Sequence, residues 1–67
     1  MNTHAYVFIG PGAWGFTFQA DAANLPVDRG PWSFFRNASI PPVGEGSVEE
    51  ARVLNDLKTR GFSLQPF

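Results

Sequence analysis

The stretch SVEEARVLNDLKTRGF, residues 47–62, contains a complete set of signals for an amphipathic helix. Ser47 and Glu50 have the spacing of a capping box, in which each side chain accepts a hydrogen bond from the other residue's backbone N–H group. Acidic residues follow the start and basic residues precede the end, as the helix dipole favours. Gly61 stands where a left-handed residue commonly ends a helix. We therefore predict a helix over residues 48–60, with an apolar stripe of Ala51, Val53, Leu54 and Leu57.

The residues before this helix show the patterns of β-strands. Residues 5–9, AYVFI, are β-branched and aromatic on both faces, and residues 14–19 alternate large apolar with small or polar side chains. A glycine- and proline-containing turn separates them, which predicts a β-hairpin over residues 5–19. Residues 32–37 predict a third strand, with Trp32 and Phe34 on one face and Phe35 on the other. Alternation over residues 62–65 can add a short fourth strand, which Pro66 confines to an edge.

These elements together predict an α+β fold. The expected architecture is a small three- to four-stranded, mainly antiparallel sheet packed by one C-terminal amphipathic helix. Residues 40–46, which contain two prolines, are expected to form an extended and exposed loop between the third strand and the helix. No repeat, linker or low-complexity tract divides the chain, so residues 1–67 form a single domain near the lower size limit for independent folding.

Charge and composition narrow the possible partners and locations. Five Lys and Arg residues against six Asp and Glu residues give a net charge of -1, which offers no broad attraction to double-stranded nucleic acid or to an anionic membrane. No apolar stretch approaches the roughly 20 residues that span a bilayer. The N-terminal apolar run lacks preceding Lys or Arg and is interrupted at residues 10–12, unlike a signal peptide. With no cysteine, the chain is expected to be a soluble cytoplasmic protein.

Residues 10–15, GPGAWG, have the spacing G-x-G-x-x-G after a predicted strand. They resemble the phosphate-binding fingerprint of NAD-dependent dehydrogenases. That resemblance implies a pyrophosphate at a helix N-terminus and an acidic residue, here Asp28, at the ribose. However, the next segment has the pattern of a strand, and the chain is too short for a doubly wound sheet. We interpret these glycines as a hairpin turn and expect no cofactor.

The sequence contains no recognisable catalytic or metal-binding pattern. His4 is the only histidine, no cysteine accompanies it, and we expect it in a frayed, solvated N-terminus. The serines lie outside any nucleophile motif. Glu49 and Glu50 are adjacent in the predicted helix, so their side chains diverge by about 100° and do not form an acid–base pair. We therefore expect no catalytic residues, no metal site and no enzyme activity.

The chain has more aromatic residues than one helix can cover. Seven Phe, two Trp and one Tyr make up 15% of the sequence. Whichever hairpin register forms, the sheet face away from the helix keeps two large apolar residues of the first strand. We expect an interaction surface made of Tyr6, Phe8, Trp32, Phe35 and Arg36. The alternative, in which residues 21–31 or 40–46 fold over that face, stays open.

Two functional hypotheses follow from this aromatic excess. The first is a non-enzymatic interaction or accessory module that binds itself as a homodimer, or an unidentified protein, through an apolar sheet face or edge. The second is a binding module for a small ligand or single-stranded nucleic acid. It would use the aromatic residues between Trp14 and Trp32 together with Arg29 or Arg36.

Overall fold

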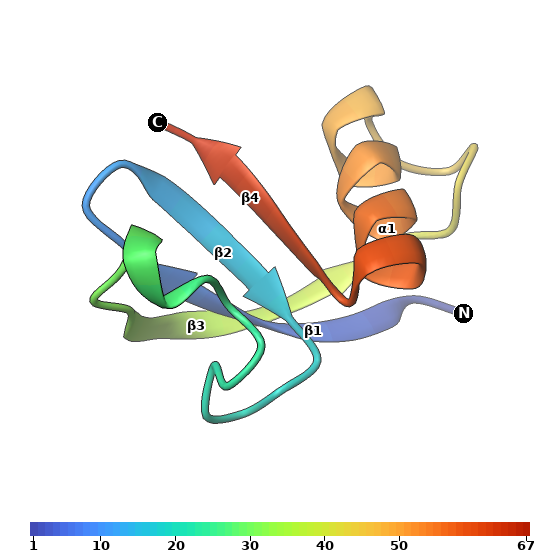
Figure 1. Cartoon of the computed structure of the whole chain (residues 1–67). Helices are drawn as coiled ribbons and strands as arrows, with labels where there is room; N and C mark the ends of the chain where they lie inside the picture. The colour runs from blue at the N-terminus through green and yellow to red at the C-terminus, as the bar shows by residue number, and fades with distance from the viewer.

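A computed structural model describes all residues, 1–67, as a four-stranded antiparallel sheet with one α-helix packed against it (Figure 1). The sheet order is β3-β1-β2-β4, so β3 and β4 form its edges. This arrangement confirms the predicted α+β fold. The elements in chain order are β1 (Thr3–Ile9), β2 (Ala13–Thr17), the 3-10 turn η1 (Val27–Arg29), β3 (Ser33–Ile40), α1 (Val48–Arg60) and β4 (Phe62–Pro66).

Helix α1 has the bounds that its local signals predict. The Glu50 backbone N–H donates to the Ser47 hydroxyl at 3.1 Å, and the Ser47 backbone N–H donates to the Glu50 carboxylate at 2.8 Å. Gly61 ends the helix in the left-handed conformation, with φ 85°. This turn directs the chain straight into β4, so the helix and the last strand lie next to each other (Figure 1).

The register of the β1–β2 hairpin decides which side chains face the helix. Val7 pairs with Phe16 and Ile9 pairs with Trp14, so these side chains share the sheet face on which α1 lies. The glycine-rich segment that resembles a nucleotide-binding fingerprint connects the two antiparallel strands, and no helix follows it. The interpretation of this segment as a hairpin turn is therefore confirmed.

Two predictions about the strand ends were wrong. β3 continues three residues beyond the predicted end, because β1 begins early enough for Thr3 to pair with Ile40. Ile40 is consequently a buried core residue instead of the start of an exposed loop. His4 lies within β1 opposite Ser39, and its exposed ring meets Tyr6 edge-on with centroids 6.0 Å apart. The N-terminus is thus held by the sheet.

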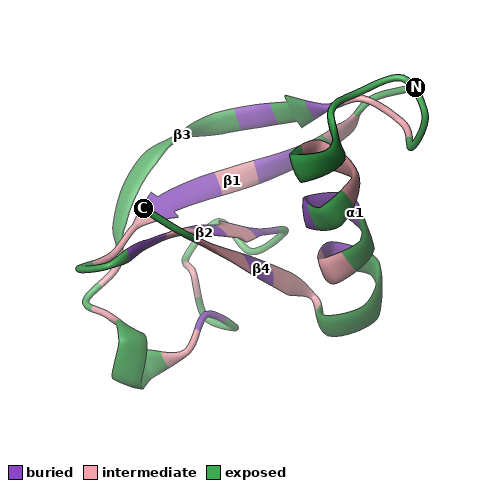
Figure 2. Ribbon diagram, turned by 90° about the horizontal axis from the view of Figure 1, so that it is seen from above, coloured by how far each residue is buried: buried purple, intermediate pink, exposed green.

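The hydrophobic core lies under α1 at one end of the sheet (Figure 2). Val53, Leu54 and Leu57 form the buried face of the helix. They pack against small and β-branched side chains of the central and outer strands, namely Ala5, Val7, Ala38 and Ile40. Trp14 and Phe16 are only partly buried beside this cluster. The short helix therefore leaves the other end of the same sheet face uncovered.

The opposite sheet face is partly covered by the segment between β2 and β3. Leu25 is buried and lies over Gly15, and the Trp32 ring lies against both Gly10 and Gly15. Phe8, on this face, is only 5% exposed. The expectation of an open apolar second face was therefore wrong in this region. A long loop can close over the sheet because glycines leave room for its side chains.

Candidate functional site

The residues predicted as one interaction surface lie on both faces of the sheet. Tyr6 and Phe8 lie on the face away from α1, together with Trp32, whose indole N–H donates to the Pro26 carbonyl at 2.8 Å. Phe35 contacts Trp14 on the helix side. The structure therefore does not bring the predicted residues together as a single patch.

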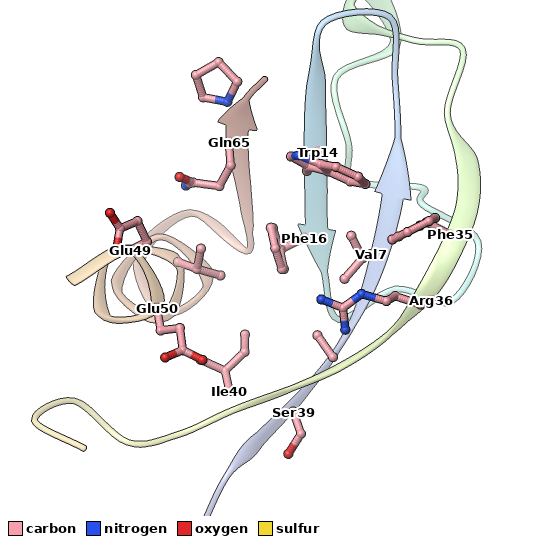
Figure 3. Close-up of a pocket in the computed structure, with 13 residues that line it drawn as sticks. Val7, Trp14, Phe16, Phe35, Arg36, Ser39, Ile40, Glu49, Glu50 and Gln65 are labelled. Atoms are coloured by element: carbon pink, nitrogen blue, oxygen red, sulfur yellow. The ribbon is translucent and has the colours of Figure 1, made fainter. Parts of the chain in front are cut away.

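An irregularity in β3 explains this division. Val7 pairs with Arg36 and Phe8 pairs with Phe34, so Phe35 is an additional residue on the outer strand. Such a β-bulge interrupts the alternation of side chains. It allows Phe35 and Arg36, although adjacent in sequence, to lie on the same side of the sheet (Figure 3). Strict alternation predicts opposite faces, and no glycine or proline within the strand marks the bulge.

The uncovered end of the helix-side face forms a hollow of about 440 Å³ (Figure 3). Side chains from β1, β2, β3, β4 and the first turns of α1 line it. Its apolar surface includes the core residues Val7, Ala38 and Val53 together with Phe16. Small-molecule sites commonly have this volume and this mixture of apolar surface with a few polar groups.

An aromatic wall runs along one side of the hollow. The Trp14 ring lies 5.0 Å from Phe35, at an interplanar angle of 50°. Trp14 also meets Phe67, which does not itself line the hollow, edge-on with ring centroids 5.0 Å apart. Phe35 and Phe67 remain 50% and 68% exposed. Phe67 was not assigned to a site from the sequence, although its place in the alternation of the C-terminal segment puts it on this face.

Arg36 is the basic group of the hollow. Its side chain extends from β3 over Val7, and its guanidinium points toward the cavity (Figure 3). Only one hydrogen bond engages it, donated to the neighbouring Asn37 carbonyl at 3.1 Å. Its carbon Cζ lies 6.0 Å from the centre of the Phe35 ring. Arg29, the other arginine considered for ligand binding, lies in η1 and does not line the hollow.

The remaining polar groups of the hollow differ in whether they already form hydrogen bonds within the protein. The Glu50 carboxylate accepts the Ser47 backbone N–H of the capping box, and the Gln65 amide donates to the Ser63 hydroxyl at 2.8 Å. Glu49 lies on the exposed first turn of α1. Arg36 is thus the polar group with the largest number of uncommitted hydrogen-bond donors.

The outer edge of β3 is the second feature of the surface. β3 pairs with β1 on one side only, and residues 33–37 are all exposed. Phe34 is 56% exposed on the face away from the helix, whereas Phe35 is exposed on the helix side. The other edge strand, β4, is shorter, ends in Pro66 and lies next to α1. β3 is therefore the edge better suited to further strand pairing.

No group of three His, Asp or Glu side chains lies close enough together to hold a metal ion. The only α-helix, α1, is too short and too polar to cross a membrane.

Comparison with known proteins identifies no relative of this chain. No family model matches the chain, and no curated protein or solved structure is significantly similar to it.

Proposed function

We propose that this protein is a small, non-enzymatic interaction module that associates with a second copy of itself through the outer edge of β3. The observation that carries the proposal is the unpaired edge with exposed phenylalanines on both faces. Unpaired N–H and C=O groups of such an edge are a template for another strand. The cysteine-free sequence is compatible with the reducing cytoplasm, where we place the protein.

Antiparallel pairing of two β3 edges satisfies the symmetry of a homodimer. A twofold axis makes the contact self-complementary, because the same strand supplies both sides. The two sheets then join into one continuous sheet, and Phe34 and Phe35 pack against cross-strand neighbours on its two faces. Arg36 placed opposite its own copy is disfavoured by like-charge repulsion, so the expected register is offset from that alignment.

The proposal is tested by the solution mass of untagged protein, measured by light scattering over a wide dilution series. We expect a dimer that dissociates on dilution. Phe34→Ser should be monomeric at every concentration, because it removes apolar surface from the interface without touching the hollow. Val48→Ser is the control, since Val48 is an exposed apolar residue at the start of α1, away from β3.

Circular dichroism of both variants checks that each retains its fold, as substitutions at exposed positions usually do. A wild-type protein that stays monomeric throughout the series would contradict the proposal. If Phe34→Ser and Val48→Ser weakened dimerisation equally, the assignment of the interface to β3 would be contradicted.

A further inference from the structure

The hollow on the helix side borders the β3 strand, from which Phe35 and Arg36 line it, and it has the form of a ligand site. It is concave and has apolar residues of the core in its surface, whereas the β3 edge is a row of backbone groups. We infer that this hollow binds a small planar aromatic molecule that carries a carboxylate. The ring would lie against the aromatic wall and the carboxylate would pair with Arg36.

The aromatic wall accounts for the ring. Trp14 and Phe35 meet at 50°, so their rings form an open corner instead of a closed stack. A third ring that stacks offset against one of these aromatic faces meets the other ring at the same 50° tilt, and the offset stack is a favourable geometry. Phe16 adds apolar surface from β2 beside this position (Figure 3). The ligand ring would replace water over residues that the short helix leaves uncovered.

Arg36 accounts for the carboxylate. The planar guanidinium offers parallel N–H donors that match the two oxygens of a carboxylate. Most of these donors are free, because Arg36 donates only to the Asn37 carbonyl. Its position beside Phe35 places the charge next to the aromatic corner. An aromatic acid would therefore reach both groups at once.

The acidic groups on the helix side do not remove this preference. Glu49 and Glu50 lie in the first turn of α1, where the positive end of the helix dipole offsets their charge. Glu50 is also held by the Ser47 backbone N–H. Arg36 approaches instead from β3, across the sheet (Figure 3). The carboxylate of the ligand is thus expected on the β3 side, with the ring toward β2.

A single arginine also favours a small acid over single-stranded nucleic acid. Proteins that bind single strands track the phosphate backbone with a series of cations beside stacked bases. Here Arg36 is the only basic residue that lines the hollow, and the chain has a net charge of -1. One anionic group on the ligand matches one guanidinium.

NMR titrations with three indole compounds test the inference. The chemical-shift changes of backbone amides give both the affinity and the location of binding. Indole-3-propionate carries a carboxylate, indole carries no charge and tryptamine carries an ammonium group. We expect indole-3-propionate to bind several-fold more tightly than the other two, since only its carboxylate can pair with the exposed Arg36 guanidinium. Its largest shifts should fall in the residues of β2 and β3 that line the hollow.

Substitutions separate the roles of the charge and the dimer. Arg36→Gln should abolish the preference for the propionate, whereas Arg29→Gln should preserve it because Arg29 lies outside the hollow. Phe34→Ser should also preserve it, so that the ligand site is tested even if self-association fails. Equal binding of the three probes, tighter binding of tryptamine or of a single-stranded oligonucleotide, or shifts elsewhere in the protein would overturn the inference.

Discussion

At the residue scale, the Trp32 ring of the loop packs against Gly10, directly after the end of β1. A Cβ atom added at Gly10 would lie 2.7 Å from a carbon of the Trp32 ring. The ring is also held by its hydrogen bond to the Pro26 carbonyl. The absence of a side chain at Gly10 therefore gives the Trp32 ring room to pack.

Gly10→Ala is expected to lower the free energy of unfolding by about 1–3 kcal/mol, the usual cost of overpacking. Urea denaturation followed by tryptophan fluorescence measures this loss. Gly12→Ala is the matched control, because no atom lies within 4 Å of a Cβ at that position. A loss at Gly10 no greater than at Gly12 would show that Trp32 does not pack as described.

Asn24 is a second residue whose role depends on distant partners. Its amide donates to the Gly61 carbonyl at 2.7 Å, and its side-chain oxygen accepts from the buried Thr17 hydroxyl. Asn24 thereby connects the end of β2 with the turn between α1 and β4. Nothing in the local sequence around Asn24 distinguishes it from an ordinary turn residue.

At the element scale, the bounds of helix α1 are determined by residues at its own ends. A single substitution at the N-cap can therefore test this. Ser47→Ala should lower the free energy of unfolding by about 1 kcal/mol, because the Glu50 backbone N–H loses its acceptor. Chemical denaturation measures the loss. Ser47→Asp is the control, since aspartate also caps helices and should retain most of the stability. Equal losses in the two variants would contradict a role for the capping bond.

Strand β3, unlike helix α1, has bounds and a shape that depend on a distant part of the chain. Its existence follows from the aromatic and β-branched pattern, but its length depends on pairing with Thr3 of β1. Its bulge places Phe35 and Arg36 on one side, which alternation alone does not predict. The candidate hollow exists because this irregularity and the short helix α1 occur on the same sheet face.

The proposed dimer predicts a coupling between association and stability at the scale of the whole molecule. If the β3 edges pair only in folded chains, mass action raises the apparent stability with protein concentration. The melting temperature of the wild-type protein should therefore rise with concentration, as measured by circular dichroism. The melting temperature of the Phe34→Ser variant should not change with protein concentration. A wild-type melting temperature independent of concentration would contradict coupled association.

Local interactions in the chain were sufficient to predict the helix bounds, the hairpin and the α+β class. Capping residues, side-chain periodicity and turn residues act over a few positions, so they can be recognised in a single sequence. The same reasoning correctly separated Trp32 and Phe34 from Phe35 across the strand. It identified Arg36 and the aromatic residues as candidates, but it placed them in one surface with Tyr6 and Phe8.

The arrangement of those residues was decided by tertiary structure. The strand order, the bulge opposite Val7 and the closure of the loop over Gly15 each bring together segments far apart in the chain. Their energies depend on pairing and packing between those segments, which no local pattern encodes. For this reason the aromatic excess was evident from composition, whereas the location of the hollow and of the exposed edge required the folded chain.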